Sequence, residues 1–182
     1  MPDLLTPDEV LARYSAGPDT GIFTDGSCDP NPGPGGWGLV WVEGGEIRAE
    51  RNGRAPDTTN NRMELLAVIV ALETLKNEGT QVTIYSDSKY VVDAVTKKWV
   101  FNWVKKKFKD KKNPDLWKRF LEIYARHEVK FVWVKGHAGN EYNEVADKLA
   151  VSAYADGVLE LKIDTGYEAS KSEDNNLNLQ FE

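Results

Sequence analysis

The hydrophobic pattern of this chain changes its period at Thr59, and that change restricts the folds open to it. Before Thr59, residues 21–27 alternate in the manner of a β-strand, residues 37–42 predict a second strand, and a hairpin signal leads into a third across residues 46–52. After it, residues 65–75 carry apolar side chains at helical spacing, and Thr59 or Asn60 is a candidate N-cap. The pattern therefore predicts three antiparallel strands followed directly by a helix.

Two glycine-rich segments are predicted to connect the first three strands. Residues 31–36 consist of Asn, Pro and Gly, a composition that predicts a turn or loop. Gly44-Gly45 is a hairpin signal between the second and third strands.

Helices and strands alternate in the second half of the chain. The predicted elements are a strand at 82–85, a helix capped by Ser88, a basic helical stretch to about Phe108, a helix at 116–126, a strand at 130–134 and a last helix capped by Asn140. Strands separated by helices favour right-handed crossovers and parallel pairing. The expected fold class is therefore α/β, with a mixed five-stranded sheet flanked by helices.

The two ends of the chain differ in composition from its middle. Residues 1–19 are expected to be a partly disordered N-terminal extension, 20–156 the working domain, and 157–182 an acidic C-terminal tail. The tail could fold over the basic segment and compete with substrate, or it could serve only solubility; the second interpretation is favoured.

Cys28 is the only cysteine, which excludes a disulfide framework and a cysteine-based zinc site. A single cysteine fits the reducing cytosol. No apolar run is long enough to span a bilayer, and the first residues lack a basic-then-apolar signal pattern. A cytoplasmic protein with no membrane partner is expected, and a monomer, because no strand or heptad pattern indicates an interface.

Positive charge is concentrated in one segment. Residues 97–119 contain ten lysine or arginine residues and two aspartates, although the whole chain has a net charge of −6. Local fields rather than net charge steer a polyanion to its docking surface. The segment is therefore a candidate nucleic-acid contact.

Four carboxylates lie in four short motifs, two at strand positions and two on helix faces. The motifs are Thr24-Asp25-Gly26-Ser27, Asn61-Arg62-Met63-Glu64-Leu65, Tyr85-Ser86-Asp87-Ser88 and Ala146-Asp147-Lys148. Each acid alone could be a helix cap or a solvated charge. If all four converge, they raise one another's pKa unless cations share the site. Hard cations such as Mg2+ bind such oxygen ligands, and the set suits a two-metal phosphodiester hydrolase.

These motifs, taken with their neighbours, resemble a known family. The matching pieces are Thr24-Asp25-Gly26-Ser27-Cys28, Asn31-Pro32-Gly33-Pro34-Gly35-Gly36-Trp37-Gly38, Thr59-Asn60-Asn61-Arg62-Met63-Glu64-Leu65, Ser86-Asp87-Ser88-Lys89-Tyr90-Val91, Trp99-Val100-Phe101-Asn102-Trp103, Asp115-Leu116-Trp117 and Trp133-Val134-Lys135-Gly136-His137-Ala138-Gly139, with Asn143 and Asp147. In this order, over about three-quarters of the chain, they resemble type 1 ribonuclease H in its bacterial form.

The resemblance implies a fold and a reaction. The fold is the ribonuclease H-like fold with strand order 3-2-1-4-5, and residues 20–156 would be its catalytic domain. The reaction is endonucleolytic cleavage of the RNA strand of an RNA–DNA hybrid, leaving 5′-phosphate and 3′-hydroxyl ends. Two Mg2+ ions, for which Mn2+ may substitute, would be held by Asp25, Glu64, Asp87 and Asp147.

Physical reasoning adds detail to these roles. Asp25 is the best candidate to bridge both ions, because a strand inside a sheet holds it rigidly. Asn143 and Asp147 are four residues apart and so share one helical face. His137 would match the family's loop histidine, which assists proton transfer or product departure; its flanking glycines permit a mobile loop, and a histidine titrates near neutrality. His127, at a helix end, is assigned no chemistry.

The resemblance also suggests which residues contact the hybrid. Cys28, Asn31 and Asn60 match positions near the shallow minor groove, where the 2′-hydroxyl of RNA is recognised. Thr59 and Asn60, at a helix N-terminus, suit a DNA phosphate. Asn61 and Asn143 are further candidate substrate contacts, and Arg62 would support this pocket or pair with an acid.

The segment from Trp99 to Lys112 resembles the family's basic protrusion. Lys105 and Lys106 would attract phosphates, and Trp99 or Trp103 could pack on a deoxyribose, although at least one tryptophan is expected to be buried. The stretch between Trp103 and Asp115 is several residues shorter than in the best-known bacterial pattern, and Phe108-Lys109 replaces its Trp-Lys.

Two alternatives remain open at this point. One is a non-catalytic hybrid-binding module, which the presence of all four acids and His137 disfavours. The other is a DNA-cutting nuclease of the same superfold, such as a resolvase, because fold alone does not determine function. The set of Cys28, Asn31 and Asn60 disfavours this second alternative.

Overall fold

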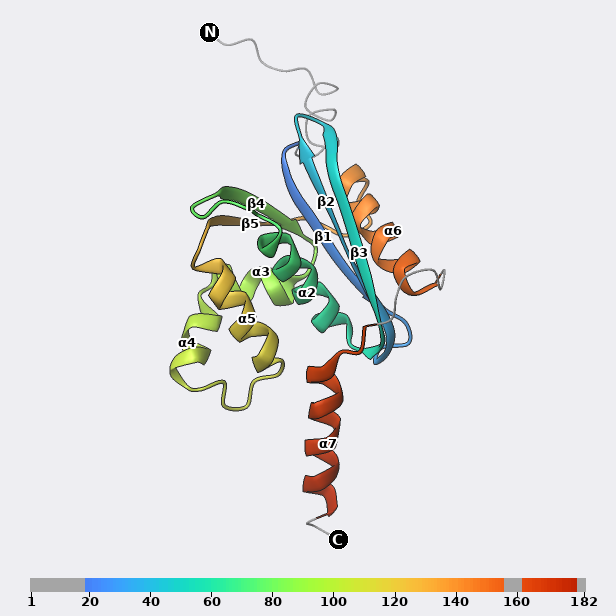
Figure 1. Cartoon of the computed structure of the whole chain (residues 1–182), viewed down its shortest axis with the longest axis vertical. Coiled ribbons are helices and arrows are strands. Elements are labelled where there is room, and N and C mark those ends of the chain that lie inside the picture. Colours follow the sequence, from blue (N-terminus) through green and yellow to red (C-terminus); the bar gives the residue numbers. More distant parts are fainter. Residues whose placement is uncertain (1–18, 156–161, 180–182) are drawn as a thin grey trace.

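The computed structural model describes residues 19–155 and 162–179 (Figure 1). The strands are β1 (Gly21–Cys28), β2 (Gly33–Glu43), β3 (Glu46–Thr58), β4 (Gln81–Ser86) and β5 (Glu128–Trp133). The helices are α2 (Asn60–Glu73), α3 (Lys89–Thr96), α4 (Trp99–Lys105), α5 (Pro114–Tyr124), α6 (Glu141–Ala155) and α7 (Thr165–Leu179). The expected extension at 1–19 lies, apart from Asp19, outside the described residues, as do residues 157–161 of the expected tail.

The five strands form one mixed sheet in the order β3-β2-β1-β4-β5. β1 pairs antiparallel with β2 and parallel with β4, and β4 pairs parallel with β5. Both the strand order and the antiparallel start predicted from the sequence are confirmed. The central position of β1 places Asp25 in the middle of the sheet, opposite Gly38 of β2.

The prediction of a loop over 31–36 is wrong for its second half. β2 begins at Gly33, and residues 33–36 pair with the end of β3. The glycines here allow α6 to pack directly on the sheet: a Cβ on Gly36 would stand 2.2 Å from the Ala150 carbonyl oxygen, and one on Gly38 2.5 Å from that of Ala146. The glycine-rich composition of this segment reflects close approach of the β2 and α6 backbones rather than a turn.

Helices cover both faces of the sheet. α2, α3 and α5 lie on one face, and α6 lies on the other (Figure 1). The larger core, on the α2 face, includes Leu65, Ile84, Trp117 and Phe120. A smaller core under α6 is built around Phe23, which stacks on Tyr85 with ring centroids 4.6 Å apart. Because apolar side chains are buried on both faces, the sheet is rigid. It therefore holds polar side chains at the ends of its strands in fixed positions.

The predicted helix starts are confirmed by their hydrogen bonds. The Thr59 hydroxyl accepts from the Arg62 backbone N–H at 3.2 Å, and the Ser88 hydroxyl accepts from that of Val91 at 3.3 Å. The Asn140 side-chain oxygen accepts from the Asn143 N–H at 3.0 Å. Each cap satisfies a donor that the helix itself leaves unpaired.

The basic helical stretch ends earlier than predicted. α4 stops at Lys105, and Lys107, Phe108, Asp110 and Asn113 all have positive φ angles. Phe108 is buried in the core, so the chain must turn inward at a position where the sequence continues with helix-compatible lysines. Tertiary packing here overrides local propensity.

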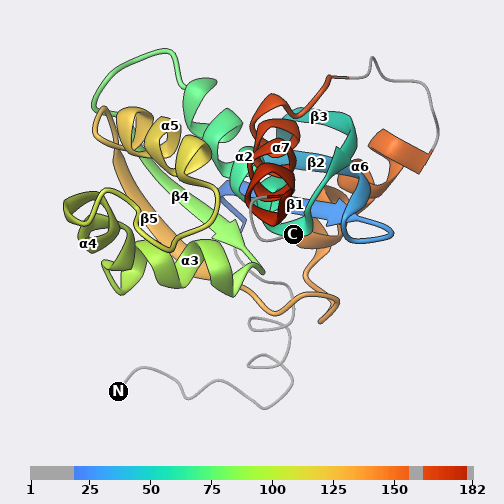
Figure 2. The ribbon, with the colours of Figure 1, turned by 90° about the horizontal axis from the view of Figure 1, so that it is seen from below.

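Most of the expected acidic tail that the structure describes is helical. α7 begins after Asp164, whose carboxylate accepts from the Tyr167 backbone N–H at 3.3 Å and so acts as its cap. Figures 1 and 2 place α7 beside the start of α2, with its far end projecting from the domain. Within the two described ranges, no helix combines the length and the apolar character needed to cross a membrane.

Candidate active site

Three carboxylates from three different elements converge beside the end of β1. Asp25 lies on β1, Glu64 in the first turns of α2, and Asp87 directly after β4. One carboxylate oxygen from each lies within 4.8 Å of the other two. Asp25 and Glu64 are buried, with exposed fractions of 4% and 5%. Oxygen ligands at this spacing can hold a divalent cation.

Gly26 brings α2 close enough to deliver Glu64. A Cβ on Gly26 would stand 2.2 Å from the Glu64 backbone nitrogen, so only glycine allows β1 and the start of α2 to approach so closely. The Gly26 N–H also donates to Asp25 Oδ1 at 2.9 Å. The same glycine thus positions one carboxylate and orients another.

The electrostatics of this cluster favour bound positive charge. Burial, with the neighbouring Asp87 charge, raises the pKa of Asp25 to about 8. Burial and then the charges of Asp25 and Asp87 raise the pKa of Glu64 well above its ordinary value. Burial also raises the pKa of Asp87, against the opposing effects of a hydrogen bond with Asp25 and of nearby His137. Each carboxylate is therefore destabilised as an anion by its surroundings.

Asp147 approaches the cluster from α6, on the other side. Its charge and its hydrogen bond to Asp25 both contribute to the raised pKa of Asp25, although it lies outside the tight group of three. Asn143, one turn earlier, is 2% exposed, and its Nδ2 has no hydrogen-bond partner within the described part of the chain. A buried amide donor without a partner next to an acidic centre is available to a ligand.

His137 lies in the exposed loop between β5 and α6, with a φ of 54°. The neighbouring Gly136 approaches Asp87 so closely that a Cβ there would stand 2.6 Å from Asp87 Oδ2. The imidazole acts on the pKa of Asp87, which places it near the acidic cluster. The loop therefore brings an imidazole side chain to the edge of the site.

The predicted minor-groove residues gather at the start of α2. The Cys28 Sγ lies 3.3 Å from the Gly33 carbonyl oxygen and 3.5 Å from that of Thr58. The Asn60 backbone N–H donates to Asn31 Oδ1 at 3.0 Å. Thr59 is the helix cap between them, and Asn61 follows with its side chain exposed. These contacts hold the predicted minor-groove residues around the junction of β3 and α2.

The two predicted tryptophans of the basic protrusion differ in burial. Trp99 is 44% exposed, and the Lys97 ammonium lies over its ring. Trp103 is partly buried, and its ring meets Trp117 edge-on at 5.7 Å. Lys105 and Lys106 are exposed. The structure thus leaves Trp99 and the lysines free for a ligand and uses Trp103 mainly for packing.

Sequence reasoning did not single out Asp164. This residue and Asp115 hold the guanidinium of Arg62, which is 3% exposed, with hydrogen bonds of 2.7–2.9 Å. Of the two roles open for Arg62, pairing with acids is the one that the structure shows. No local signal marks Asp164, because its partner is 102 residues away in the chain.

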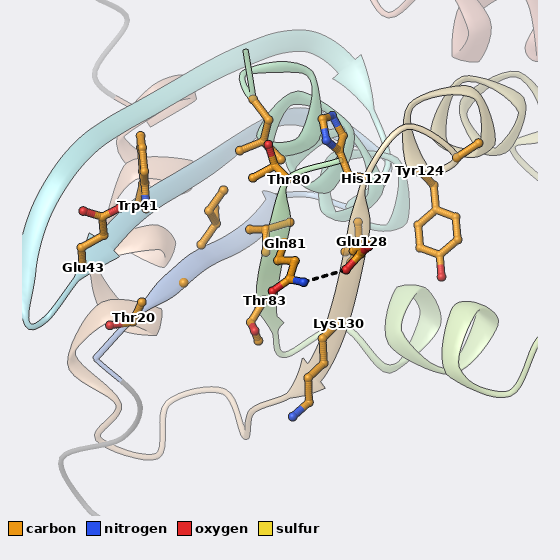
Figure 3. A pocket seen from close by; sticks show the side chains of 16 residues that line it. Thr20, Trp41, Glu43, Thr80, Gln81, Thr83, Tyr124, His127, Glu128 and Lys130 are labelled. Carbon is orange, nitrogen blue, oxygen red and sulfur yellow. Dashed lines mark hydrogen bonds between the residues drawn. The ribbon is translucent and has the colours of Figure 1, made fainter. Parts of the chain in front are cut away.

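A hollow lined by strand residues lies away from the carboxylates (Figure 3). It has a volume of about 890 Å³ and is lined by the first residues of β1, β4 and β5, whereas Asp25 and Asp87 lie toward the opposite strand ends. Gln81 donates to Glu128 across it at 2.9 Å, and His127 lies in its wall. No carboxylate of the acidic cluster contributes to this hollow.

The fold and the acidic cluster define a class of protein: a nuclease domain with a carboxylate centre that can hold metal ions. The model of the RNase H family matches residues 18–155. The chain belongs to the ribonuclease H family, and its activity is that of an endoribonuclease acting on the RNA strand of RNA–DNA hybrids.

Individual relatives agree with this assignment. The chain is 50% identical over 152 residues to a ribonuclease H of Trichodesmium erythraeum, covering 81% of this chain and 94% of the relative. It is 48% identical over 138 residues to a ribonuclease HI of a Synechocystis strain, covering 73% and 86%. Both relatives are enzymes by name, so neither the binding module nor the DNA-cutting nuclease is supported.

Solved structures resemble the whole domain. LC9-RNase H1, a type 1 enzyme with a type 2 active-site motif, matches with a TM-score of 0.67 at 34% identity, over 84% of this chain and 82% of the other. LC11-RNase H1, solved in complex with an RNA/DNA hybrid, matches with a TM-score of 0.59 at 27% identity, over 75% and 97%.

Proposed function

We propose that Asp25, Glu64, Asp87 and Asp147 hold two Mg2+ ions, replaceable by Mn2+, and that this centre hydrolyses the RNA strand to 5′-phosphate and 3′-hydroxyl ends. The observation that carries the proposal is the convergence of three carboxylate oxygens within 4.8 Å, on three separate elements. Buried carboxylates this close together repel one another as anions, and a bound cation would relieve that repulsion.

The residues present fit such ions. Glu64 Oε2 is buried and has no hydrogen-bond partner among the described residues, which is costly unless a ligand satisfies it. The donors are hard carboxylate oxygens, which Mg2+ prefers. When bound, divalent ions stabilise charge on the phosphate and on the departing 3′-oxygen and make a water more acidic.

The protein's own side chains position the ligands of the site and transfer protons. Asp25 is held by the Gly26 N–H and by the central strand, which suits a bridging ligand. The free Nδ2 of Asn143 suits an oxygen of the substrate or of ordered water next to Asp147. His137, on its exposed loop, can accept or release a proton at the edge of the site and return it to solvent.

Recognition of the hybrid is divided between two surfaces. Cys28, Asn31 and Asn60 form the proposed minor-groove surface, where the 2′-hydroxyl distinguishes RNA from DNA. The positive end of the α2 helix dipole and the Thr59 side chain suit a phosphate of the DNA strand. Trp99, Lys105 and Lys106 supply a further contact from α4.

A monomer acting in the cytoplasm is also proposed. The free thiol of Cys28 fits a reducing compartment. Light scattering after gel filtration tests the oligomeric state, and a mass near 20.4 kDa is expected.

Calorimetric titration of Mg2+ and Mn2+ into protein without nucleic acid tests the centre itself. Binding is expected for the native protein and a strong loss of affinity for Asp25→Asn, because one bridging charge is removed. Asp110→Asn, in the exposed turn after α4, is the matched control and should bind as the native protein does. Equal binding by native protein and Asp25→Asn would overturn the assignment.

A further inference from the structure

The described C-terminal residues run along the start of α2 rather than over the basic protrusion. The Lys162 backbone N–H donates to the Arg54 carbonyl oxygen at 3.2 Å, so the segment first meets the edge strand β3. It then crosses to α2, where Figure 1 and Figure 2 show α7 beginning. Contacts of Asp164 and Lys171 place this segment next to Asp57, Thr58 and Arg62, which adjoin Thr59 and Asn60 in the chain.

Asp164 fastens this segment to the first turn of α2. Its carboxylate accepts from Arg62 Nε and Nη2, each at 2.8 Å, and from the Thr58 hydroxyl at 2.7 Å. Thr58 is fully buried and Asp164 is 10% exposed, so the bonds form largely out of water. Thr58 and Arg62 flank the proposed phosphate-binding residues on both sides. Docking of the segment therefore restrains the backbone that carries them.

Gly166 shows how closely the segment is docked. A Cβ there would stand 2.0 Å from Asp115 Oδ2 and 2.6 Å from Arg62 Nη2. A larger residue at this position would overlap the Arg62 and Asp115 side chains, so either the segment or this ion pair must shift. The position thus offers a way to disturb the docking of the segment without altering any charge.

Lys171 of α7 pairs with Asp57, two residues before Thr59, and also with Glu168, three residues earlier on α7, at 3.0 Å. The side chains of Asp57 and Lys171 are 36% and 40% exposed, so both can act on a bound polyanion. Tyr167 lies beside them, with the Lys171 ammonium 5.2 Å from its ring centroid. The Asp57 charge also contributes, after burial, to the raised pKa of the Cys28 thiol, which places this carboxylate beside the minor-groove surface.

An unpaired carboxylate at Asp57 would repel the phosphate that the start of α2 is suited to bind. We propose that the C-terminal segment is a working part of the substrate-binding surface: Asp164 anchors it, and Lys171, shared between Asp57 and Glu168, offsets the charge of Asp57 beside the phosphate-binding start of α2. This inference rests on the proposed function. Lys171 is a positioning and charge-compensating residue and has no part in the chemical step.

A double-mutant cycle on the exposed pair of Lys171 and Asp57 tests this inference. Hybrid cleavage is measured for native protein, Lys171→Ala, Asp57→Asn and the double variant at low and high salt. Lys171→Ala is expected to raise KM about fivefold at low salt with kcat unchanged, and high salt should remove most of the effect. Asp57→Asn alone should lower KM, and the double variant should return it to the native value. Lys130→Ala, on β5, is the matched control and should leave KM unchanged.

Displacing the segment gives an independent readout. Gly166→Val should raise KM at least as much as Lys171→Ala, with kcat reduced less than KM is raised, because the carboxylate cluster is not touched. Circular dichroism and the thermal midpoint show whether each variant is folded.

The outcomes of these experiments distinguish a failure of the inference from a failure of the proposed function. A native KM for Lys171→Ala at low salt, or an equal rise in the presence and absence of Asp57, would overturn the inference while hybrid cleavage by the native protein stands. Absence of hybrid cleavage by the native protein would instead contradict the proposed function.

Discussion

Gly26 of β1 and Glu64 of α2 meet so closely that a single methyl group cannot fit between them: a Cβ on Gly26 would stand 2.2 Å from the Glu64 backbone nitrogen. Strand and helix are thereby held at the separation that brings Glu64 to Asp25. The geometry of the carboxylate cluster thus depends on a residue that carries no functional group.

Gly26→Ala is therefore expected to reduce kcat strongly. The methyl group must push the start of α2 outward, and displacement of a catalytic ligand by about 1 Å can cost about 100-fold in rate. Overpacking should also lower the free energy of unfolding by about 1–3 kcal/mol. Steady-state hybrid cleavage and urea unfolding measure the two effects. Gly79→Ala, at a φ of 74° in a turn away from the site, is the control: it should destabilise the fold without lowering kcat.

The metal-free protein should lose stability as pH rises from about 4 to about 8. In the folded state the pKa of Asp25 is raised to about 8 from 3.8, so the folded protein binds more protons than the unfolded chain within this window. Stability is therefore present at low pH and falls by about 1.4 kcal/mol per pH unit for each proton difference. Urea unfolding in EDTA measures it. Asp25→Asn should flatten the dependence, and a flat profile for the native protein would contradict the burial of a charged cluster.

Arg62→Ala should destabilise the fold by about 3–5 kcal/mol, because it leaves the Asp115 and Asp164 carboxylates without their buried partner. Removal of the more exposed pair, through Arg119→Ala, should cost less than about 1 kcal/mol, since both Arg119 and Glu73 are partly exposed. Chemical unfolding compares the two variants. Equal losses would show that the Arg62 network has no special weight.

Trp99 and Trp103 should separate binding from stability. Trp99→Ala is expected to raise KM for the hybrid with little change in unfolding free energy, because its ring is exposed. Trp103→Ala should cost about 2–4 kcal/mol of stability, because its ring packs edge-on against the buried Trp117. KM and urea midpoints of the two variants measure the difference. A raised KM for Trp103→Ala together with a native KM for Trp99→Ala would contradict this prediction, because Trp103 rather than Trp99 would then contact the substrate.

The features predictable from the sequence are those that local patterns encode. Thr59 and Ser88 cap helices because a hydroxyl before an apolar period satisfies free N–H groups, whatever the rest of the chain does. The cluster of Asp25, Glu64 and Asp87 was predicted from short motifs and from the resemblance, and the structure brings these three side chains together.

The features that sequence could not predict depend on distant partners. Gly33–Gly36 belongs to a strand rather than a loop because it pairs with the end of β3 and Gly36 packs under α6, which lies more than a hundred residues later. The docking of Asp164 on Arg62 is equally long-range, and an acidic residue in an acidic segment carries no local sign of its partner. Composition alone cannot distinguish such a residue from a solvated charge.

Cleavage of matched RNA–DNA, RNA–RNA and DNA–DNA duplexes, with Mg2+ or EDTA, by native protein and Asp25→Asn side by side tests the carboxylate centre most directly. The native protein should cut only the RNA strand of the hybrid and only with metal, and Asp25→Asn should bind the hybrid without cutting it. Cleavage in EDTA, or full activity of Asp25→Asn with Mg2+, would contradict a metal centre built on Asp25.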